Sequence, residues 1–167
     1  YWNSKAYNIK GNVCHQHNIL SDVRWIAKEN SLDIETVYHL AAEARIQPSF
    51  NKKDLVFKTN VMGTVSMLEV ARELKARRFV YSSTSSAYGN ALISFSQIRR
   101  PPCSTPYAAG KVGGELACFA YDTTGAEDEL QTTVLRYFNV YGSRQPIKGQ
   151  YAPVVGLFLR QKAEGKP

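Results

Sequence analysis

Two side chains suited to removing a proton stand four residues apart in the segment "PYAAGK", at Tyr107 and Lys111. If this segment is helical, both side chains lie on one face and can reach the same substrate atom. A tyrosine phenol has a pKa of about 10, and bringing it to about 7 takes about 4 kcal/mol. One ammonium about 4.5 Å away supplies roughly 3.7 kcal/mol at an effective dielectric of about 20. A second positive charge, such as an oxidised nicotinamide ring, would complete the shift, so the pattern favours hydride transfer over hydrolysis.

The Tyr-x-x-x-Lys spacing is weak evidence by itself, because the chain carries a second copy at Tyr1 and Lys5. The copy at Tyr107 differs because the hydroxyl-rich segment "SSTSS" at 82–86 ends an apolar run and precedes it. The Thr84 hydroxyl in this segment could orient a substrate oxygen and relay its proton. In the alternative interpretation, Tyr107 is a packing residue, Lys111 is a solvated charge and the serine-rich segment is the start of a loop.

Short apolar runs alternate with helix-like stretches along the chain. The predicted strands are rich in Val, Tyr, Phe and Thr and lie at 36–42, 77–84 and 131–140, with a weaker one at 7–13. The predicted helices lie at 21–30, 60–76 and 106–125. This alternation predicts an α/β fold with a parallel sheet covered by helices on both faces. Ligands bind such sheets at the carboxyl ends of the strands, where the hydroxyl-rich segment is expected.

The composition is typical of a soluble globular protein, with a formal net charge of +7. Basic residues are scattered or lie at helix ends without base-stacking aromatic residues, so nucleic-acid binding is not expected. No window is apolar enough for a membrane span. The three cysteines, Cys14, Cys103 and Cys118, are irregularly spaced, which predicts reduced thiols. The first residues are polar and aromatic and do not resemble a signal peptide, so a cytoplasmic protein is expected. The segment "CHQH" at 14–17 has no second ligand cluster, so no metal site is expected.

Five segments in order resemble the extended short-chain dehydrogenase/reductase superfamily and, within it, the nucleotide-sugar epimerases. They are "VYHLAAEA", "TNVMGTVSMLEVAR", "RFVYSSTSSAYG", "PYAAGK" and "VLRYFNVYGSRQ", and they extend over nearly the whole chain. The resemblance implies a Rossmann-like, doubly wound parallel sheet with NAD as the cofactor. It also implies a UDP-sugar substrate and a homodimeric assembly.

The resemblance further implies roles for residues at matching positions. Tyr107 would take the proton from the sugar 4-hydroxyl, Lys111 would lower the pKa of this base and bind the nicotinamide ribose, and Thr84 matches the family's catalytic Ser/Thr. Asn139 would contact the substrate diphosphate. The implied cofactor-binding positions, besides Tyr107 and Lys111, are Asn12, Val13, Leu40, Ala41, Ala42, Asn60, Ser82, Ser83, Tyr137 and Phe138. Asn12 departs from the Asp that relatives have at this position.

The positions after Thr84 distinguish two subgroups of the family. Sugar-nucleotide 4,6-dehydratases look like Thr-Asp-Glu here, and the two acids handle water elimination. This chain has Ser85 and Ser86, which favours a UDP-sugar 4-epimerase that oxidises C4, rotates the ketosugar and returns the hydride to its other face. The segment at 142–155 is similar to that of epimerases acting on UDP-sugars, including N-acetylated ones. The alternatives are another extended-family reductase or decarboxylase, or a catalytically silent dinucleotide-binding relative.

The chain departs from the family in lacking the glycine-rich segment G-x-x-G-x-x-G, which places the cofactor pyrophosphate at a helix N-terminus. We therefore expect the chain to be roughly half of a family member, without the first βαβ unit. Residues 1–141 would be a partial NAD-binding domain, and 142–167 the start of a substrate-binding region. Gly113 and Gly114 lower helix propensity, and either a close backbone approach, such as a partner helix in a dimer, or relaxed packing would explain them.

Overall fold

The computed structural model describes residues 33–89, 103–122, 130–142, 145 and 154–165. The chain divides into two compact units, Tyr1–Arg136 and Tyr137–Pro167. The predicted strand at 7–13 and the predicted helix at 21–30 lie outside the described residues. The assignment of the two parts to cofactor and substrate binding stays a prediction.

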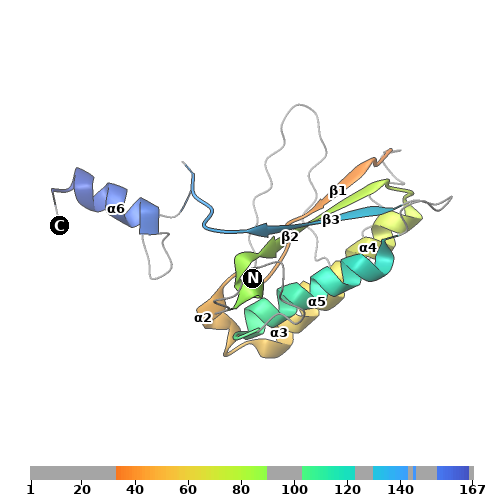
Figure 1. The fold of residues 1–167 in the computed structure, drawn as a ribbon, viewed down its shortest axis with the longest axis horizontal. Coiled ribbons are helices and arrows are strands. Elements are labelled where there is room, and N and C mark those ends of the chain that lie inside the picture. Colours follow the sequence, from red (N-terminus) through yellow and green to blue (C-terminus); the bar gives the residue numbers. More distant parts are fainter. Residues whose placement is uncertain (1–32, 90–102, 123–129, 143–144, 146–153, 166–167) are drawn as a thin grey trace. The chain divides into compact units, whose positions relative to one another are not determined.

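A three-stranded sheet in the order β1-β2-β3 forms the centre of the described fold (Figure 1). Its strands are β1 (Thr36–His39), β2 (Arg78–Thr84) and β3 (Gln131–Tyr137). β1 and β2 are parallel, with Thr36 opposite Arg78 and His39 opposite Tyr81. The three predicted apolar runs therefore form strands of an α/β fold, although β1 and β3 end before the predicted positions 42 and 140.

The helices of the described part follow the strands in the order that the alternation predicts. After β1 come α2 (Ile46–Ser49), α3 (Lys53–Phe57), the π-helix η1 (Lys58–Met62) and α4 (Gly63–Glu73). After β2 come the 3₁₀-helix η2 (Ser85–Tyr88) and α5 (Pro106–Tyr121). α4 and α5 lie side by side against the same face of the sheet (Figure 1). Helices were expected on both faces of the sheet, and the described helices α4 and α5 cover one of these faces.

The hydrophobic core lies between this sheet face and the two long helices. Successive residues of a strand point to opposite faces, so Phe79 and Tyr81 of β2 share a face, and both point toward the helices. They pack with Leu68 of α4 and Cys118 of α5. Burying apolar side chains of this size contributes about 1.5–3 kcal/mol each. This packing fixes α5, and with it Tyr107 and Lys111, against β2.

The boundaries of α5 have local causes. Thr105 is the N-cap, and its hydroxyl accepts a hydrogen bond from Ala108 N at 3.0 Å. Pro106 follows at the first helical position, where its missing N–H costs nothing. The helix ends at Tyr121 and not at the predicted 125, because the Asp122 carboxylate accepts hydrogen bonds from both the backbone N–H and the hydroxyl of Thr132.

The helical run predicted at 60–76 is shifted toward the N-terminus. It begins at Lys53, passes through η1, and ends at Glu73. The end is a Schellman motif, in which Lys75 N donates to Arg72 O at 3.0 Å and Ala76 N to Ala71 O at 2.9 Å. Lys75 adopts a left-handed φ of 55°. A glycine usually marks this position, so the residue types around Lys75 do not indicate that the helix stops here.

The glycines of α5 allow close packing against segments of the same chain. A Cβ at Gly110 would lie 3.1 Å from Cγ1 of Val56, and one at Gly113 would lie 2.8 Å from Cγ2 of Val61. A Cβ at Gly114 would lie 2.9 Å from the Asn60 carbonyl oxygen. The close backbone approach that we expected as one explanation is therefore present at Gly114, where the neighbour is the η1 backbone of this chain, whereas Gly110 and Gly113 face side chains of α3 and η1. A partner helix is not needed to explain these glycines.

The variant Gly114→Ala is expected to lower the free energy of unfolding by about 2 kcal/mol. The new methyl group would meet the Tyr81 phenol, with Cζ at 2.6 Å, as well as the Asn60 carbonyl. Overpacking of this kind costs about 1–3 kcal/mol and outweighs the better helix propensity of alanine. Denaturant unfolding measures the change, and Gly142→Ala is the control, because nothing lies within 4 Å of a Cβ at Gly142. Equal stability of the Gly114 and Gly142 variants would contradict the close packing.

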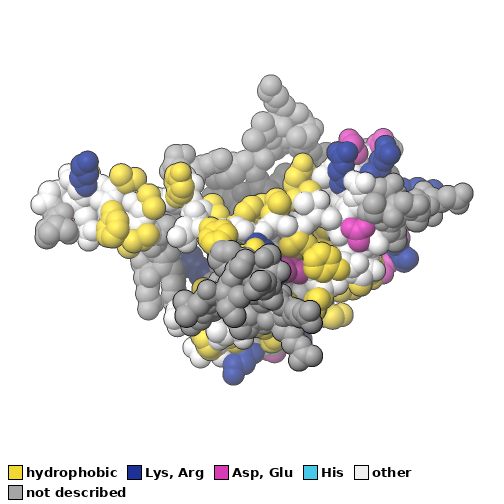
Figure 2. Space-filling view, viewed as in Figure 1, with side chains coloured by type: hydrophobic (Ala, Val, Ile, Leu, Met, Phe, Trp, Pro, Cys, Tyr) yellow, Lys and Arg dark blue, Asp and Glu magenta, His cyan; other side chains and the backbone are white. Residues whose placement is uncertain are grey.

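The described part of the second unit consists of the chain after β3 and the helix α6 (Val154–Ala163). Gly142 N donates a hydrogen bond to Oε1 of Gln145 at 3.3 Å. Val154, Phe158 and Leu159 of α6 are exposed, and Figure 2 shows hydrophobic side chains at the surface of this helix. No described helix has the length and apolar character that crossing a membrane requires.

Candidate active site

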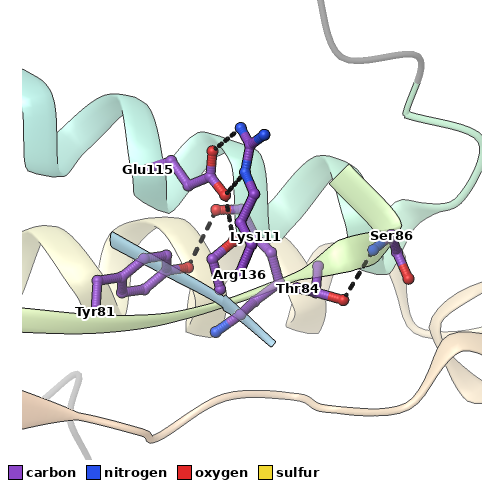
Figure 3. Close-up of polar contacts among 7 residues, drawn as sticks. Tyr81, Thr84, Ser86, Lys111, Glu115 and Arg136 are labelled. Atoms are coloured by element: carbon purple, nitrogen blue, oxygen red, sulfur yellow. Dashed lines mark hydrogen bonds and ion pairs between the residues drawn. The ribbon is translucent and has the colours of Figure 1, made fainter. Parts of the chain in front are cut away.

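The carboxyl end of β2 carries the hydroxyl groups that the sequence singled out. Thr84 is buried, and its Oγ1 accepts a hydrogen bond from Ser86 N at 3.2 Å, which caps η2. Ser83 is also buried and donates a hydrogen bond to the Glu115 carboxylate. Ser82 is half-buried. Figure 3 shows Thr84 and Lys111 together at this end of the strand.

Lys111 reaches this region from α5, and its side chain is only 3% exposed. Its Nζ lies 4.5 Å from the centroid of the Tyr81 ring, close enough for a cation–π interaction. The Tyr81 phenol donates to Lys111 O at 3.2 Å, so the strand also holds the helix backbone. No carboxylate of the described residues forms an ion pair with Lys111. The interpretation of Lys111 as a solvated charge is therefore wrong.

Burial lowers the pKa of Lys111 to about 8, and the nearby Cys118 and Glu115 raise it by smaller amounts. At pH 7 the ammonium form still exceeds the amine by about ten to one, since each pH unit is a factor of ten. Lys111 can therefore supply a positive charge near neutral pH, and it loses this charge as the pH rises through about 8.

Tyr107 lies in the first turn of α5, one turn before Lys111. Its backbone N–H donates to Oγ of Ser49 at 3.3 Å, which ties the start of α5 to α2. The Tyr107 side chain is half-buried. Burial is the chief cause that raises the pKa of Tyr81, and Tyr107 is among the neighbouring groups that add to the rise. Residues four apart on a helix share a face, so the observed helix α5 allows the expected arrangement, and the convergence of the Tyr107 phenol and the Lys111 ammonium stays a prediction.

Asn60 holds the segment that follows β1. Its Oδ1 accepts a hydrogen bond from Glu43 N at 2.8 Å, and its Nδ2 donates to Glu43 O at 3.1 Å. Asn60 is fully buried within η1, and this pair of bonds fixes the turn at Leu40, Ala41 and Ala42. Leu40 and Ala41 are exposed, and Ala42 is buried.

Sequence reasoning missed the ion pair that closes the site on the side of α5. Glu115 is 2% exposed, and its carboxylate accepts two hydrogen bonds from Arg136 of β3, from Nε at 2.9 Å and from Nη2 at 2.6 Å (Figure 3). The Tyr88 ring lies on Arg136, with 4.7 Å between Cζ and the ring centroid. The available signal was the spacing, because Glu115 follows Lys111 by one helical turn and lies between apolar residues.

The catalytic and binding roles of all the predicted site residues stay predictions. Asn12 and Val13 lie outside the described residues. Tyr137, Phe138 and Asn139 belong to the second unit, and all three are exposed. Within the described ranges, no group of three or more His, Cys, Asp and Glu side chains could hold a metal ion.

Comparison with known proteins identifies the family. Residues 3–167 match the model of the NAD dependent epimerase/dehydratase family, and the chain belongs to this family. A UDP-N-acetyl-alpha-D-glucosaminuronate decarboxylase of Bacillus cytotoxicus is 31% identical over 78% of this chain and 41% of its own length. A dTDP-glucose 4,6-dehydratase of Streptomyces niveus is 31% identical over 89% of this chain and 45% of its own length.

Solved structures agree with this membership. The UDP-glucose 4-epimerase of Thermotoga maritima with UDP-glucose superposes with a TM-score of 0.75 and is 30% identical, over 91% of this chain and 49% of that one. The chain thus spans less than half the length of these relatives. The predicted family, its α/β Rossmann-like fold and its dependence on NAD are confirmed. The relatives include decarboxylase, dehydratase and epimerase activities, so family membership alone leaves the reaction open.

Proposed function

We propose that the protein is an NAD-dependent epimerase that acts at C4 of a UDP-sugar, through transient oxidation to a 4-ketosugar. The observation that carries this proposal is that no carboxylate in the described part of the site is placed to assist the elimination of water. Ser85 and Ser86 follow Thr84, at positions where a dehydratase would place acids for water elimination. The buried carboxylate of Glu115 is held by two hydrogen bonds from Arg136, so it is not poised to protonate a leaving group.

Residues of this chain would perform the proton transfers. The Tyr107 phenolate would take the proton of the sugar 4-hydroxyl and return it after the ketosugar has rotated. The Thr84 hydroxyl would orient the same oxygen, and the Lys111 ammonium would stabilise the phenolate. NAD, when bound, supplies the acceptor for the C4 hydride and the donor that gives it back to the other face of the sugar. The nicotinamide is therefore unchanged over a complete cycle.

The described residues fit part of this cofactor. The Lys111 ammonium is buried but has no carboxylate partner among the described residues, and its three N–H groups suit the hydroxyls of the nicotinamide ribose. The turn at Leu40, Ala41 and Ala42, held by Asn60, would lie along the cofactor. Tyr137, Phe138 and Ser82 would complete the lining, and Asn139 would contact the diphosphate of the substrate. The chain contains no glycine-rich segment for the pyrophosphate.

Incubation of the intact protein with UDP-glucose, UDP-galactose and their N-acetylated forms tests the proposal. We expect interconversion of a pair of C4 epimers, followed by NMR, with no net change in nicotinamide absorbance. Consumption of NADH would identify a reductase, release of carbon dioxide from a UDP-uronic acid a decarboxylase, and loss of the C6 oxygen a dehydratase. No turnover of any of these compounds would favour a catalytically silent relative.

We also infer that the protein works in the cytoplasm as a homodimer, with α5 in the interface. The described cysteines, Cys103 and Cys118, are free thiols, as expected in a reducing compartment. Leu116 and Phe119 of α5 are 63% and 62% exposed, and residues three apart share a helix face. A second copy of the same helix would cover this apolar pair symmetrically.

The double variant Leu116→Asp/Phe119→Asp is expected to raise the dimer dissociation constant at least about 100-fold, because it places buried charges in the interface. Sedimentation velocity over a range of concentrations measures this constant. Phe158→Asp is the control, since Phe158 of α6 is equally exposed at 64% but belongs to the second unit. An unchanged dimer in the α5 variant would exclude this face as the interface.

A further inference from the structure

The ion pair between Glu115 and Arg136 joins the three elements that meet at the candidate active site. Glu115 belongs to α5, Arg136 to β3, and Ser83 of β2 donates to the same carboxylate. Ser83 precedes Thr84 directly, and Glu115 follows Lys111 by one turn of the same helix. Figure 3 shows Glu115, Arg136 and Lys111 between α5 and the carboxyl end of β2. Moving the carboxylate would therefore shift the strand that carries Thr84 relative to the turn that carries Lys111.

The geometry of the pair is that of a permanent ion pair. Two parallel hydrogen bonds from a guanidinium to a carboxylate give the strongest and most directional form of this contact. The Tyr88 ring covers the guanidinium on another side. The hydrogen bond to Glu115 is the main cause that raises the pKa of Arg136 above its ordinary value, so Arg136 keeps its charge at all working pH values.

In the described part of the fold, most titratable groups near Lys111 are neutral at pH 7. His39 of β1 is neutral near pH 7, because burial lowers its pKa to about 4. Tyr81 of β2 and Cys118 of α5 are neutral because burial raises their pKa values, that of Cys118 to about 12. Cys118 and Glu115 are the groups whose charge raises the pKa of Lys111, and Arg136 is the ion-pair partner of Glu115.

We propose that Glu115 and Arg136 act as paired positioning residues: the ion pair locks the strand end with Thr84 to the helical turn with Lys111, and it holds the Glu115 carboxylate where it helps to keep Lys111 an ammonium. This inference rests on the proposed function, in which the ammonium supports Tyr107. Neither residue of the pair touches the reacting atoms. Both act through Lys111 and Thr84.

The proposed effect of the ion pair on the charge of Lys111 is tested by titrating Lys111 in the intact protein. Its ε-carbon NMR signal is assigned with Lys111→Arg and followed against pH in three proteins: wild type, Glu115→Gln and Glu115→Gln/Arg136→Gln. In Glu115→Gln the carboxylate is lost and the Arg136 charge is left uncompensated, so the Lys111 midpoint should fall by about one pH unit, the size of effect that one nearby charge has at an effective dielectric of about 20. In the double variant the Arg136 charge is gone as well, and the midpoint should recover part of the way to the wild-type value.

A purely structural pair would give a different pattern. Both variants would lose stability, but the Lys111 midpoint would not fall in Glu115→Gln and recover in the double variant. The control is Glu69→Gln, which removes the carboxylate of another Glu–Arg pair, Arg72–Glu69 on α4, and should leave the midpoint unchanged. An unmoved midpoint in Glu115→Gln, an equal shift in the double variant, or failure of both variants to fold would overturn the proposal.

Failure of this inference can be told apart from failure of the proposed function. The high-pH limit of turnover in the wild type should coincide with the Lys111 midpoint and move with it in Glu115→Gln. If the NMR midpoints follow the expected pattern but turnover does not depend on them, the ion pair tunes Lys111 and the proposed role of Lys111 is wrong. If turnover follows the wild-type midpoint but Glu115→Gln leaves both unchanged, the proposed function stands and the role of the pair is rejected.

Discussion

Replacing Tyr107 by phenylalanine is expected to reduce turnover of the UDP-sugar at least about 100-fold, the lower end of what a positioned acid–base group contributes. The change removes one hydroxyl and leaves the ring. The backbone contact of Tyr107 with Ser49 and the packing of the first turn of α5 stay in place. Steady-state kinetics should therefore show a lower kcat with little change in the free energy of unfolding.

Tyr121→Phe is the matched control for this prediction. Tyr121 lies at the other end of the same helix, and its hydroxyl donates to Glu69 of α4, away from the candidate site. We expect it to keep near-normal turnover. Near-normal turnover of Tyr107→Phe would show that the phenol is not the base, and the reaction would need another proton acceptor.

Lys111→Met is expected to abolish most activity and, at the same time, to stabilise the fold by about 3 kcal/mol at pH 7. Burial lowers the pKa of Lys111 from 10.5 to about 8, and a change of one in a pKa corresponds to about 1.4 kcal/mol. The native state therefore holds a buried ammonium that the unfolded chain would solvate freely. Methionine has a similar length and no charge, so it removes this cost.

The pH dependence of this stabilisation has a defined sign. Below pH 8 Lys111 is protonated in both the folded and unfolded states, and the cost in the wild type is complete. Between about 8 and 10.5 the unfolded chain binds more protons, so the wild type gains stability as the pH rises. The difference from Lys111→Met should shrink across this window. Denaturant unfolding at several pH values measures it, with the exposed Lys53→Met as control, and a destabilised Lys111→Met at pH 7 would contradict the account.

The sequence predicted the elements whose signals are local. The apolar runs became β1, β2 and β3, and the Thr105-Pro106 start of α5 was predictable because cap and proline are adjacent in the chain. The i, i+4 spacing of Tyr107 and Lys111 also needs only a helix to place both on one face. The family motifs added the order of these elements and the role expected of Thr84.

Contacts between distant segments could not be predicted in the same way. Asn60 bonds the backbone of Glu43 from within a π-helix, and nothing near position 60 indicates that the helical run starts at Lys53. Position 114 requires a glycine because the Tyr81 side chain lies where a Cβ would be. Glu115 resembles an ordinary surface residue of a helix until Arg136, from another strand, is folded beside it.

The most direct test of the central claim uses UDP-glucose that carries deuterium at C4. If C4 is oxidised and reduced again within one active site, the UDP-galactose formed by the intact protein should keep the deuterium at C4, without exchange into water and without net NADH. Galactose that carries solvent hydrogen at C4, or a product with an altered C6, would contradict transient oxidation and return of the hydride at C4.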